Sequence, residues 1–216
     1  NNGREITGDS LFYNEKTGIS QGFGNVVYKD TLNKNELDAD YFWYNEQTGF
    51  AFATDKAVMK EYSQKDTLYL HADTMKVYTF NINTDSVYRR AHCYNHVRAY
   101  RTDVQAVCDS LVYCTKDSCL TMYKDPITWN GNRQLLGEVI EAYMKDSVID
   151  RVHVINQALS VEQLEDSIHF NQISAKDMYG FFDNGEIHKT EAIGNVLAAY
   201  FMQDDKDSSL MSMAYI

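Results

Sequence analysis

The side chains of this sequence that could bind a metal ion or act as a general base are its histidines. None of the six stands in a metal-binding or nucleophile motif. His92 and His96 share one face of an expected strand, but four residues of strand separate them by roughly 13 Å, too far for one ion. We therefore expect no metal site and no cofactor. The full set is His71, His92, His96, His153, His169 and His188.

Four aspartates recur along the chain and could be imagined as the acid and base of a glycosidase: Asp9, Asp40, Asp73 and Asp109. Catalytic groups must converge at one place, whereas residues that recur once per repeat form a ladder along the array. We expect these carboxylates to hold turns or neighbouring strands. Glycine-rich phosphate loops and Ser/His/Asp signatures are also missing, so we expect a protein that is not an enzyme; a β-helix polysaccharide lyase or hydrolase is the enzymatic alternative.

The four cysteines, Cys93, Cys108, Cys114 and Cys119, lie in one short region without the paired spacings of a zinc site. Four residues separate Cys114 from Cys119, which makes a disulfide across a hairpin feasible in an oxidising compartment. The alternative is a set of buried thiols.

Composition and charge restrict the partners. The 216 residues are 44% hydrophobic with a single proline, which is typical of a folded, strand-rich protein. A net charge of −11 repels phosphate backbones, so we expect no nucleic acid partner, and an anionic lipid would have to be held by its tails. The sequence shows neither an apolar stretch of roughly 18 residues nor a signal peptide at its start. An exported protein whose signal peptide has been removed would also lack both features.

A repeat organises the chain. The segment from Gly8 to Gly18 reappears from Ala39 to Gly49, and weaker copies begin at Ala72, Cys108, Ile140 and Ala175. Two residues after the second position of each copy stands a large side chain: Leu11, Phe42, Met75, Leu111, Tyr143 and Met178.

Each copy has a second feature, a turn-prone residue followed two places later by an apolar one. The pairs are Gly24/Val26, Asp55/Ala57, Asn95/Val97, Asp125/Ile127, Asn156/Ala158 and Gly194/Val196. Polar turn clusters separate the two features, as at Asn14 to Gly18 and Asn45 to Gly49. Strand, turn and strand make a β-hairpin, here repeated six times.

Because one hairpin cannot bury its apolar side alone, the hairpins must stack. We expect an all-β fold of tandem β-hairpins over a single domain, residues 1–216, with at most a short helical turn near Val161 to Asp166. The last residues, Ser208 to Ile216, look like the start of a seventh copy, so we expect a fragment of a longer repeat protein. The large residues and their small partners would line a common core, or an open groove between two sheets.

The repeated Ala-Asp entries (Leu37 to Asp40, Leu70 to Asp73), the Gly-Asn exits (Gly24 to Tyr28, Gly194 to Ala198) and the stretch Asn171 to Phe182 resemble the OstA-like/LptA superfamily. The last stretch looks most like its Bacteroidetes OstA-like members. The resemblance covers nearly the whole chain but rests on degenerate hairpin motifs. It implies a twisted, partly open β-jelly roll that carries lipopolysaccharide across the periplasm, possessing a groove for acyl chains and joining other such proteins edge to edge.

From this resemblance we expect a periplasmic or outer-membrane-associated carrier of lipopolysaccharide or a related glycolipid. Its partners would be other Lpt-type envelope proteins or a second copy, joined through edge strands near Ile6 to Tyr13 and Gly194 to Phe201. The alternative is a carbohydrate-binding or adhesive surface module, in which Phe12, Tyr41, Trp43 and Tyr179 stack on sugars. The groove-facing residues would be Leu11, Val26, Phe42, Ala57, Met75, Val97, Leu111, Ile127, Tyr143, Ala158, Met178 and Val196.

Overall fold

The computed structural model describes residues 3–146, 148–183, 185–203 and 210–215. Within these ranges the regular secondary structure is β-strand, and the paired strands described below run antiparallel, which confirms the expected all-β fold of tandem hairpins. No helix in the described part of the chain is long and apolar enough to cross a membrane. The chain divides into two compact units, Asn1–Cys119 (unit 1) and Leu120–Ile216 (unit 2). The expectation of one domain over 1–216 stays a prediction.

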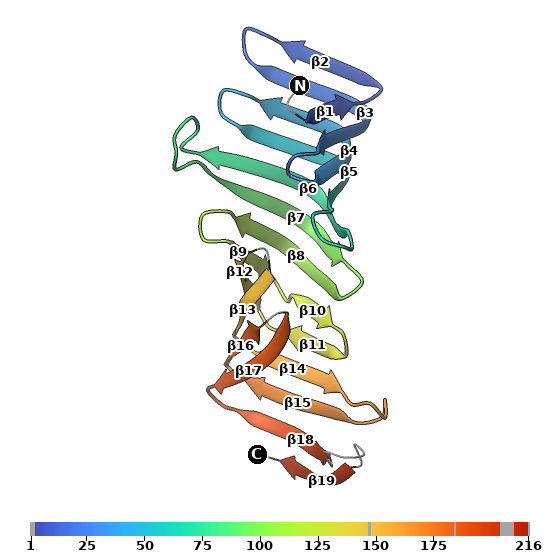
Figure 1. The fold of residues 1–216 in the computed structure, drawn as a ribbon, viewed down its shortest axis with the longest axis vertical. Coiled ribbons are helices and arrows are strands. Elements are labelled where there is room, and N and C mark those ends of the chain that lie inside the picture. Colours follow the sequence, from blue (N-terminus) through green and yellow to red (C-terminus); the bar gives the residue numbers. More distant parts are fainter. Residues whose placement is uncertain (1–2, 147, 184, 204–209, 216) are drawn as a thin grey trace. The chain divides into compact units, whose positions relative to one another are not determined.

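Unit 1 is a meander of long strands that follow one another hairpin by hairpin (Figure 1). β2 pairs with β3, and each following strand through β8 pairs with the one before it. The strands are β1 (Arg4–Thr7), β2 (Ser10–Asn14), β3 (Ile19–Asp30), β4 (Asn35–Asn45), β5 (Phe50–Glu61), β6 (Leu68–Phe80), β7 (Tyr88–Tyr100) and β8 (Val104–Cys114).

The repeated Asn-Glu-x-Thr-Gly sequence forms two matching hairpin turns. The Asn14 side-chain oxygen accepts hydrogen bonds from the backbone N–H groups of Lys16 and Thr17, at 3.1 and 3.3 Å. Asn45 repeats this arrangement in the next hairpin. Gly18 closes the first turn at a φ of 64°, a conformation that glycine adopts without steric cost. The expected hairpins at these two sites are confirmed, and local side-chain chemistry explains them.

Each long strand of unit 1 bends at a corner. Along β3, β5 and β7 the corner is two consecutive residues at positive φ, and the neighbouring strand places a single aspartate against them, so that two residues oppose one in a bulge. The corner divides each strand into two arms. The first arm contains β2 and its equivalents, and the second arm contains β1 and its equivalents. The positive-φ pairs are Gly24/Asn25, Asp55/Lys56 and Asn95/His96, which coincide with the second repeated feature of the sequence.

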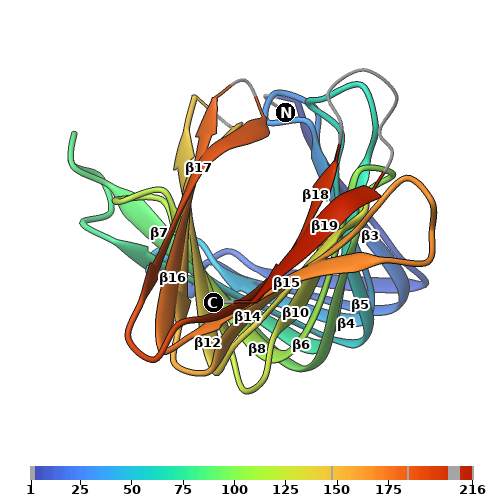
Figure 2. The ribbon, with the colours of Figure 1, turned by 90° about the horizontal axis from the view of Figure 1, so that it is seen from below.

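Unit 2 has the same bends, but they interrupt the strands. β12 pairs with β13, β13 with β16 and β16 with β17 on one arm, while β11, β14, β15, β18 and β19 pair in that order on the other. Figure 2 shows β16 and β17 of the one arm and β15, β18 and β19 of the other. The strands are β9 (Cys119–Tyr123), which runs across the unit boundary, β10 (Ile127–Asn130), β11 (Arg133–Leu136), β12 (Val139–Lys145), β13 (Val148–Ile155), β14 (Ala158–Gln163), β15 (Phe170–Ala175), β16 (Asp177–Asp183), β17 (Glu186–Ile193), β18 (Leu197–Gln203) and β19 (Leu210–Tyr215).

Three expectations about this part of the chain need comment. Near Val161 to Asp166, where we expect at most a short helical turn, Val161 to Gln163 continue β14 and a turn without a helix follows. The seventh copy is represented by β19, which pairs with β18, while residues 208, 209 and 216 lie outside the described ranges. The segment Gly194 to Phe201 is not an edge, because β18 is paired with β15 on one side and with β19 on the other.

Candidate functional site

One face of the unit 1 sheet, here called the inner face, carries rows of apolar side chains that run across the strands. The corner row consists mostly of small residues and is buried except at Cys108, which is half-buried. The row beside it on the first arm alternates a large side chain with a small one. By register the corner row is Val26, Ala39, Ala57, Ala72, Val97 and Cys108, and its neighbour is Leu11, Gly22, Phe42, Ala53, Met75, Cys93 and Leu111.

Burial on this face decreases with distance from the corner. Ala57 and Ala72 in the corner row have no exposed surface. The next row of the second arm is still apolar, yet most of its members are only half-buried. That row is Ile6, Tyr28, Leu37, Met59, Leu70, Ala99 and Ala106. The inner face therefore presents apolar surface that the chain itself does not fully cover.

The two arms of unit 1 meet at the corner through stacked aromatic rings. Tyr28 of the second arm lies parallel to Phe42 of the first arm, with ring centroids 5.8 Å apart and planes 12° apart. Burial raises the pKa of Tyr28, which keeps its hydroxyl neutral at physiological pH. The contact shows that the inner rows of the two arms face each other near the corner.

In unit 2 the inner rows of both arms surround a cavity of about 10 Å³, room for roughly one water molecule. Leu135 and Ser160 line it from one arm, and Val152, Val154 and Met178 from the other. Val154 and Met178 are 1% and 2% exposed. The unit 2 interior next to the corner is thus filled by its own side chains.

Ten of the twelve residues predicted to face the groove lie on an inner face, nine by register and Val196 by its place one residue before the Leu197–Ser174 pair, and two do not. Leu11 and Val196 are on the inner face but remain 46% and 40% exposed. Ile127 pairs with Leu136, the neighbour of the cavity-lining Leu135, and adjacent residues of a strand point to opposite faces. The inward residue of this corner is the fully buried Pro126 instead.

Tyr143 is the second correction. It lies on the outer face, where the Arg151 guanidinium sits 4.4 Å from its ring centroid and its hydroxyl donates to Glu141 at 2.8 Å. Ile140, which is 1% exposed, occupies the inner position. Lipid contact by the ten inward residues stays a prediction.

Both misplacements are errors of alignment within the repeat. The fifth copy starts at Gly137-Glu138, because the Glu138 N–H bonds to the Asn156 carbonyl at 3.1 Å, as the Asp9 N–H bonds to that of Gly24 at 2.9 Å. The match of Gly137-Glu138-x-Ile140 to Gly8-Asp9-x-Leu11 was readable in the sequence. In the fourth copy the positive-φ pair is Lys124/Asp125, one residue earlier than expected.

The recurring acids face the corner residues of the neighbouring strand, as expected of a structural role. Asp9 accepts a hydrogen bond from the Asn25 amide at 3.0 Å, and Asp40 forms an ion pair with Lys56 at 2.7 Å. His96 Nδ1 lies 2.8 Å from Asp73. In unit 2, Glu138 accepts from Gln157 at 2.7 Å. These groups lie one per hairpin along the corner, and no group of three or more metal-ligating side chains occurs among the described residues.

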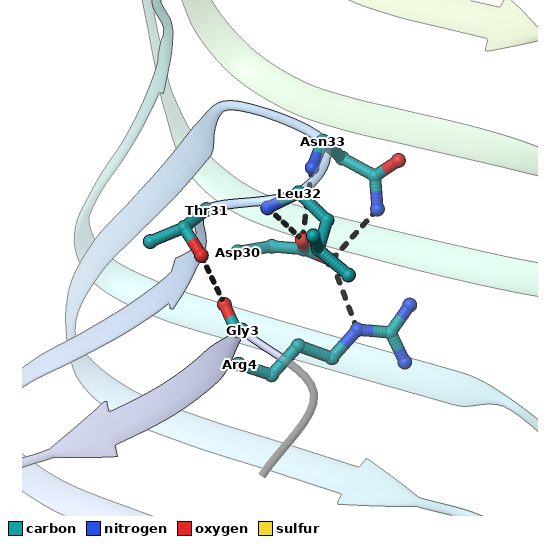
Figure 3. A network of polar contacts seen from close by, with 6 residues as sticks. All are labelled: Gly3, Arg4, Asp30, Thr31, Leu32 and Asn33. Atoms are coloured by element: carbon teal, nitrogen blue, oxygen red, sulfur yellow. Dashed lines mark hydrogen bonds and ion pairs between the residues drawn. The ribbon is translucent and has the colours of Figure 1, made fainter.

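A buried carboxylate, that of Asp30, links β1 to the turn that follows β3 (Figure 3). Asp30, 3% exposed, accepts hydrogen bonds from Arg4 Nε at 2.9 Å and from the Asn33 amide at 2.8 Å. It also accepts from the backbone N–H groups of Leu32 and Asn33. Burial acts to raise the pKa of Asp30, but the hydrogen bonds from Asn33 and Arg4 outweigh it, so the pKa lies below its usual value.

The outer face of the first arm of unit 1 is rich in aromatic side chains. Phe23 touches both Phe12 and Tyr41, with centroid distances of 5.9 and 5.1 Å, and Phe50 touches Trp43 and Tyr78. By register its rows are Ser10, Phe23, Tyr41, Thr54, Thr74, Tyr94 and Ser110; then Phe12, Gln21, Trp43, Phe52, Lys76, His92 and Val112; then Asn14, Ile19, Asn45, Phe50, Tyr78, Arg90 and Cys114.

The feasible disulfide between Cys114 and Cys119 is not formed in the structure, where both side chains are buried thiols, the alternative interpretation. Cys114 lies opposite Arg90 in the β7–β8 ladder, and its proximity raises the pKa of Arg90. On the inner face, burial raises the pKa of Cys93 to about 12, so this thiol is unreactive at neutral pH.

Comparisons with known proteins give a distant structural likeness. No family model matches the sequence, and no curated protein matches it. Among solved structures, the chain is similar to LptH of Pseudomonas aeruginosa, the LptA-homologous periplasmic component of the conserved lipopolysaccharide transport device. The identity is 13%, the TM-score is 0.44, and the alignment covers 56% of this chain and 81% of that one.

Proposed function

We propose that this chain is a periplasmic carrier that contributes to lipopolysaccharide transport and holds acyl chains against the inner face of unit 1. The observation that carries the proposal is the second-arm row next to the corner, from Ile6 to Ala106, most of whose apolar side chains are only half-buried although the corner row is buried except at Cys108. Exposed contiguous apolar surface is characteristic of a binding site rather than of a finished core. The resemblance of the hairpin motifs to the OstA-like family directs the proposal to lipopolysaccharide or a related glycolipid.

The energetics favour binding by tails. An acyl chain of about twelve carbons that leaves water contributes on the order of 10 kcal/mol at ~0.8 kcal/mol per methylene, before ordering costs. Polar groups stand at the ends of both arms: Arg4, Asp30, Asn35 and Glu61 lie beside Leu68 in the outermost inner row of the second arm, and Thr79 and Arg89 lie at the end of the first arm. A ligand with apolar tails and a polar head fits this gradient, with its head left in solvent.

The proposal includes assembly through strand edges, with other Lpt-type envelope proteins or a second copy as partners. In unit 2 the last strand, β19, supports this role because its apolar side chains are open to solvent. Met211, Met213 and Tyr215 are 68%, 56% and 72% exposed. An edge strand with such side chains is a template for pairing with another strand.

The test is displacement of a bound apolar dye by lipopolysaccharide, with a matched pair of variants. Met59 and Val58 are adjacent and half-buried, but Met59 is on the inner face and Val58 on the outer face. Met59→Glu places a carboxylate beside the tails and should weaken displacement by about tenfold or more, whereas Val58→Glu should leave it within about twofold. Equal effects of the two variants, or a dye that lipopolysaccharide never displaces, would contradict the proposal.

A further inference from the structure

The outer aromatic face of unit 1, defined by the three rows given above, has an unusual charge. The chain as a whole contains 31 acidic residues against 20 basic ones. Yet none of the residues in the three rows, all of them described in the structure, is Asp or Glu, while Lys76 and Arg90 are both present. This face is therefore a cationic surface on an acidic protein.

The cations lie over aromatic rings. The Lys76 amine is 5.8 Å from the Phe52 centroid and 5.4 Å from that of Tyr94, and the Arg90 guanidinium is 5.8 Å from Phe80. Cation–π contacts of this kind hold the charge above the ring surface. The pKa of His92, between them, is lowered by burial and then by the charges of Arg90 and Lys76. Both charges therefore act on the imidazole that lies beside them.

The aromatic rings stay accessible and are interleaved with polar groups. Phe12 and Phe23 are 61% and 41% exposed. Gln21 donates a hydrogen bond to the Tyr41 hydroxyl at 3.2 Å, so amide and phenol groups stand beside the rings. The outer face of the second arm differs, because Lys60 there is neutralised by Glu36 and Asp38 at 2.7 and 2.6 Å.

We propose that the outer aromatic face binds an acidic polysaccharide, with sugar rings on the aromatic surfaces and carboxylate or phosphate groups paired to Lys76 and Arg90. Charge complementarity selects an anionic ligand, because the three rows contain two cations and no carboxylate side chain. A polysaccharide fits better than a membrane, because Ile19 and Val112 are the only aliphatic hydrocarbon side chains in the three rows. This site is separate from the inner face and requires no acyl chain.

The test is calorimetric titration of the full chain with polygalacturonate at low and high salt, with neutral dextran as the glycan control. Lys76→Glu/Arg90→Glu should weaken binding on the order of tenfold, as expected for loss and reversal of two ion pairs. Lys16→Glu/Lys65→Glu makes the same change in net charge at exposed positions off this face and should leave binding within about twofold. If the reversal variant unfolds, Lys76→Gln/Arg90→Gln should still weaken binding severalfold.

A second pair of substitutions tests the stacking surface. Phe12→Leu/Phe23→Leu keeps apolar side chains but removes the flat rings, and should weaken polygalacturonate binding severalfold without a change in salt dependence. Dextran binding as tight as polygalacturonate, equal loss in both charge-reversal pairs, or binding only to phosphatidylglycerol vesicles would overturn the proposal. Lipopolysaccharide displacement of the dye should be unchanged in all these variants, which separates this site from the inner face.

Discussion

The two units build their inner faces from the same repeat but fill them differently. In unit 1 the second strands of successive hairpins place Gly22, Ala53 and Cys93 opposite the large side chains of the first strands. In unit 2 the equivalent row runs Ile140, Val154, Met178 and Ala192, so a larger residue, Val154, stands on the first of its second strands. Gly137 makes room for Val154, whose side chain fills the place of a Cβ there.

The rows next to the corner show which apolar surface each unit leaves uncovered. On the first arm of unit 1 this row is buried except at Leu11, and in unit 2 Val154 and Met178 of the equivalent row line a cavity of about 10 Å³. Side chains in a well-packed interior leave few voids larger than a water molecule. The row on the other arm is mostly half-buried in both units, but in unit 2 Thr128 and Ser160 interrupt it, whereas in unit 1 it runs from Ile6 to Ala106 without a serine or threonine. The same hairpin frame therefore packs one row in each unit and leaves the more continuous apolar row partly exposed in unit 1.

The largest expected effect tests the packing of unit 2. Ile140→Ala removes a fully buried side chain and should lower the free energy of unfolding by about 2–5 kcal/mol. Tyr143→Phe removes only a hydrogen bond to Glu141 on the outer face and should cost about 1 kcal/mol. Urea denaturation monitored by tryptophan fluorescence and circular dichroism measures both. A larger loss of unfolding free energy for Tyr143→Phe than for Ile140→Ala would favour the repeat alignment that places Tyr143 on the inner face.

A second prediction compares a carboxylate turn in each unit. Asp30 in unit 1 and Asp166 in unit 2 both accept backbone hydrogen bonds within a turn. The N–H of His169, then that of Ile168, lowers the pKa of Asp166 to about 2. Because both folded-state pKa values lie below the ordinary value of 3.8, each group stabilises the fold above about pH 4 and loses this contribution as pH falls further.

The buried Asp30 should matter more. Asp30→Asn should cost about 1–3 kcal/mol at neutral pH, because a charged acceptor of four hydrogen bonds is lost. Asp166→Asn should reduce the loss of stability that occurs below about pH 4, without changing the hydrogen exchange of β1. Unfolding midpoints between pH 6 and pH 2, with hydrogen exchange at Ile6, distinguish the two variants. If the pH dependence of stability is unchanged in both variants, the lowered pKa values of Asp30 and Asp166 would be refuted.

The smallest expected effect concerns the corners. Lys56→Met removes an exposed ion pair with Asp40 and should lower the thermal midpoint slightly at low salt and not at all at high salt. Gln157→Met removes a hydrogen bond to Glu138 in unit 2 and should lower the midpoint slightly at both salt concentrations. Thermal midpoints at two salt concentrations check this; identical salt responses would show that the two corners do not differ in kind.

Sequence reasoning located most of the hairpins and most of the inward residues. It succeeded where local chemistry is decisive, as in the turns opened by Asn14 and Asn45, whose side chains cap their own backbone. It failed at Ile127 and Tyr143, because shifts of one and three residues in aligning the fourth and fifth copies each moved a side chain to the opposite face. It also missed the second-arm row, since Tyr28, Leu37 and Met59 fall between the repeated features.

The sequence by itself determined the hairpin period, the all-β class and the polar corners, because these depend on residues close together in the chain. Only the tertiary structure decided which strand register holds, which apolar rows stay uncovered and that one outer face lacks carboxylates. Those properties arise from pairing between strands twenty or more residues apart, as between Asp30 and Arg4, and no local pattern contains them.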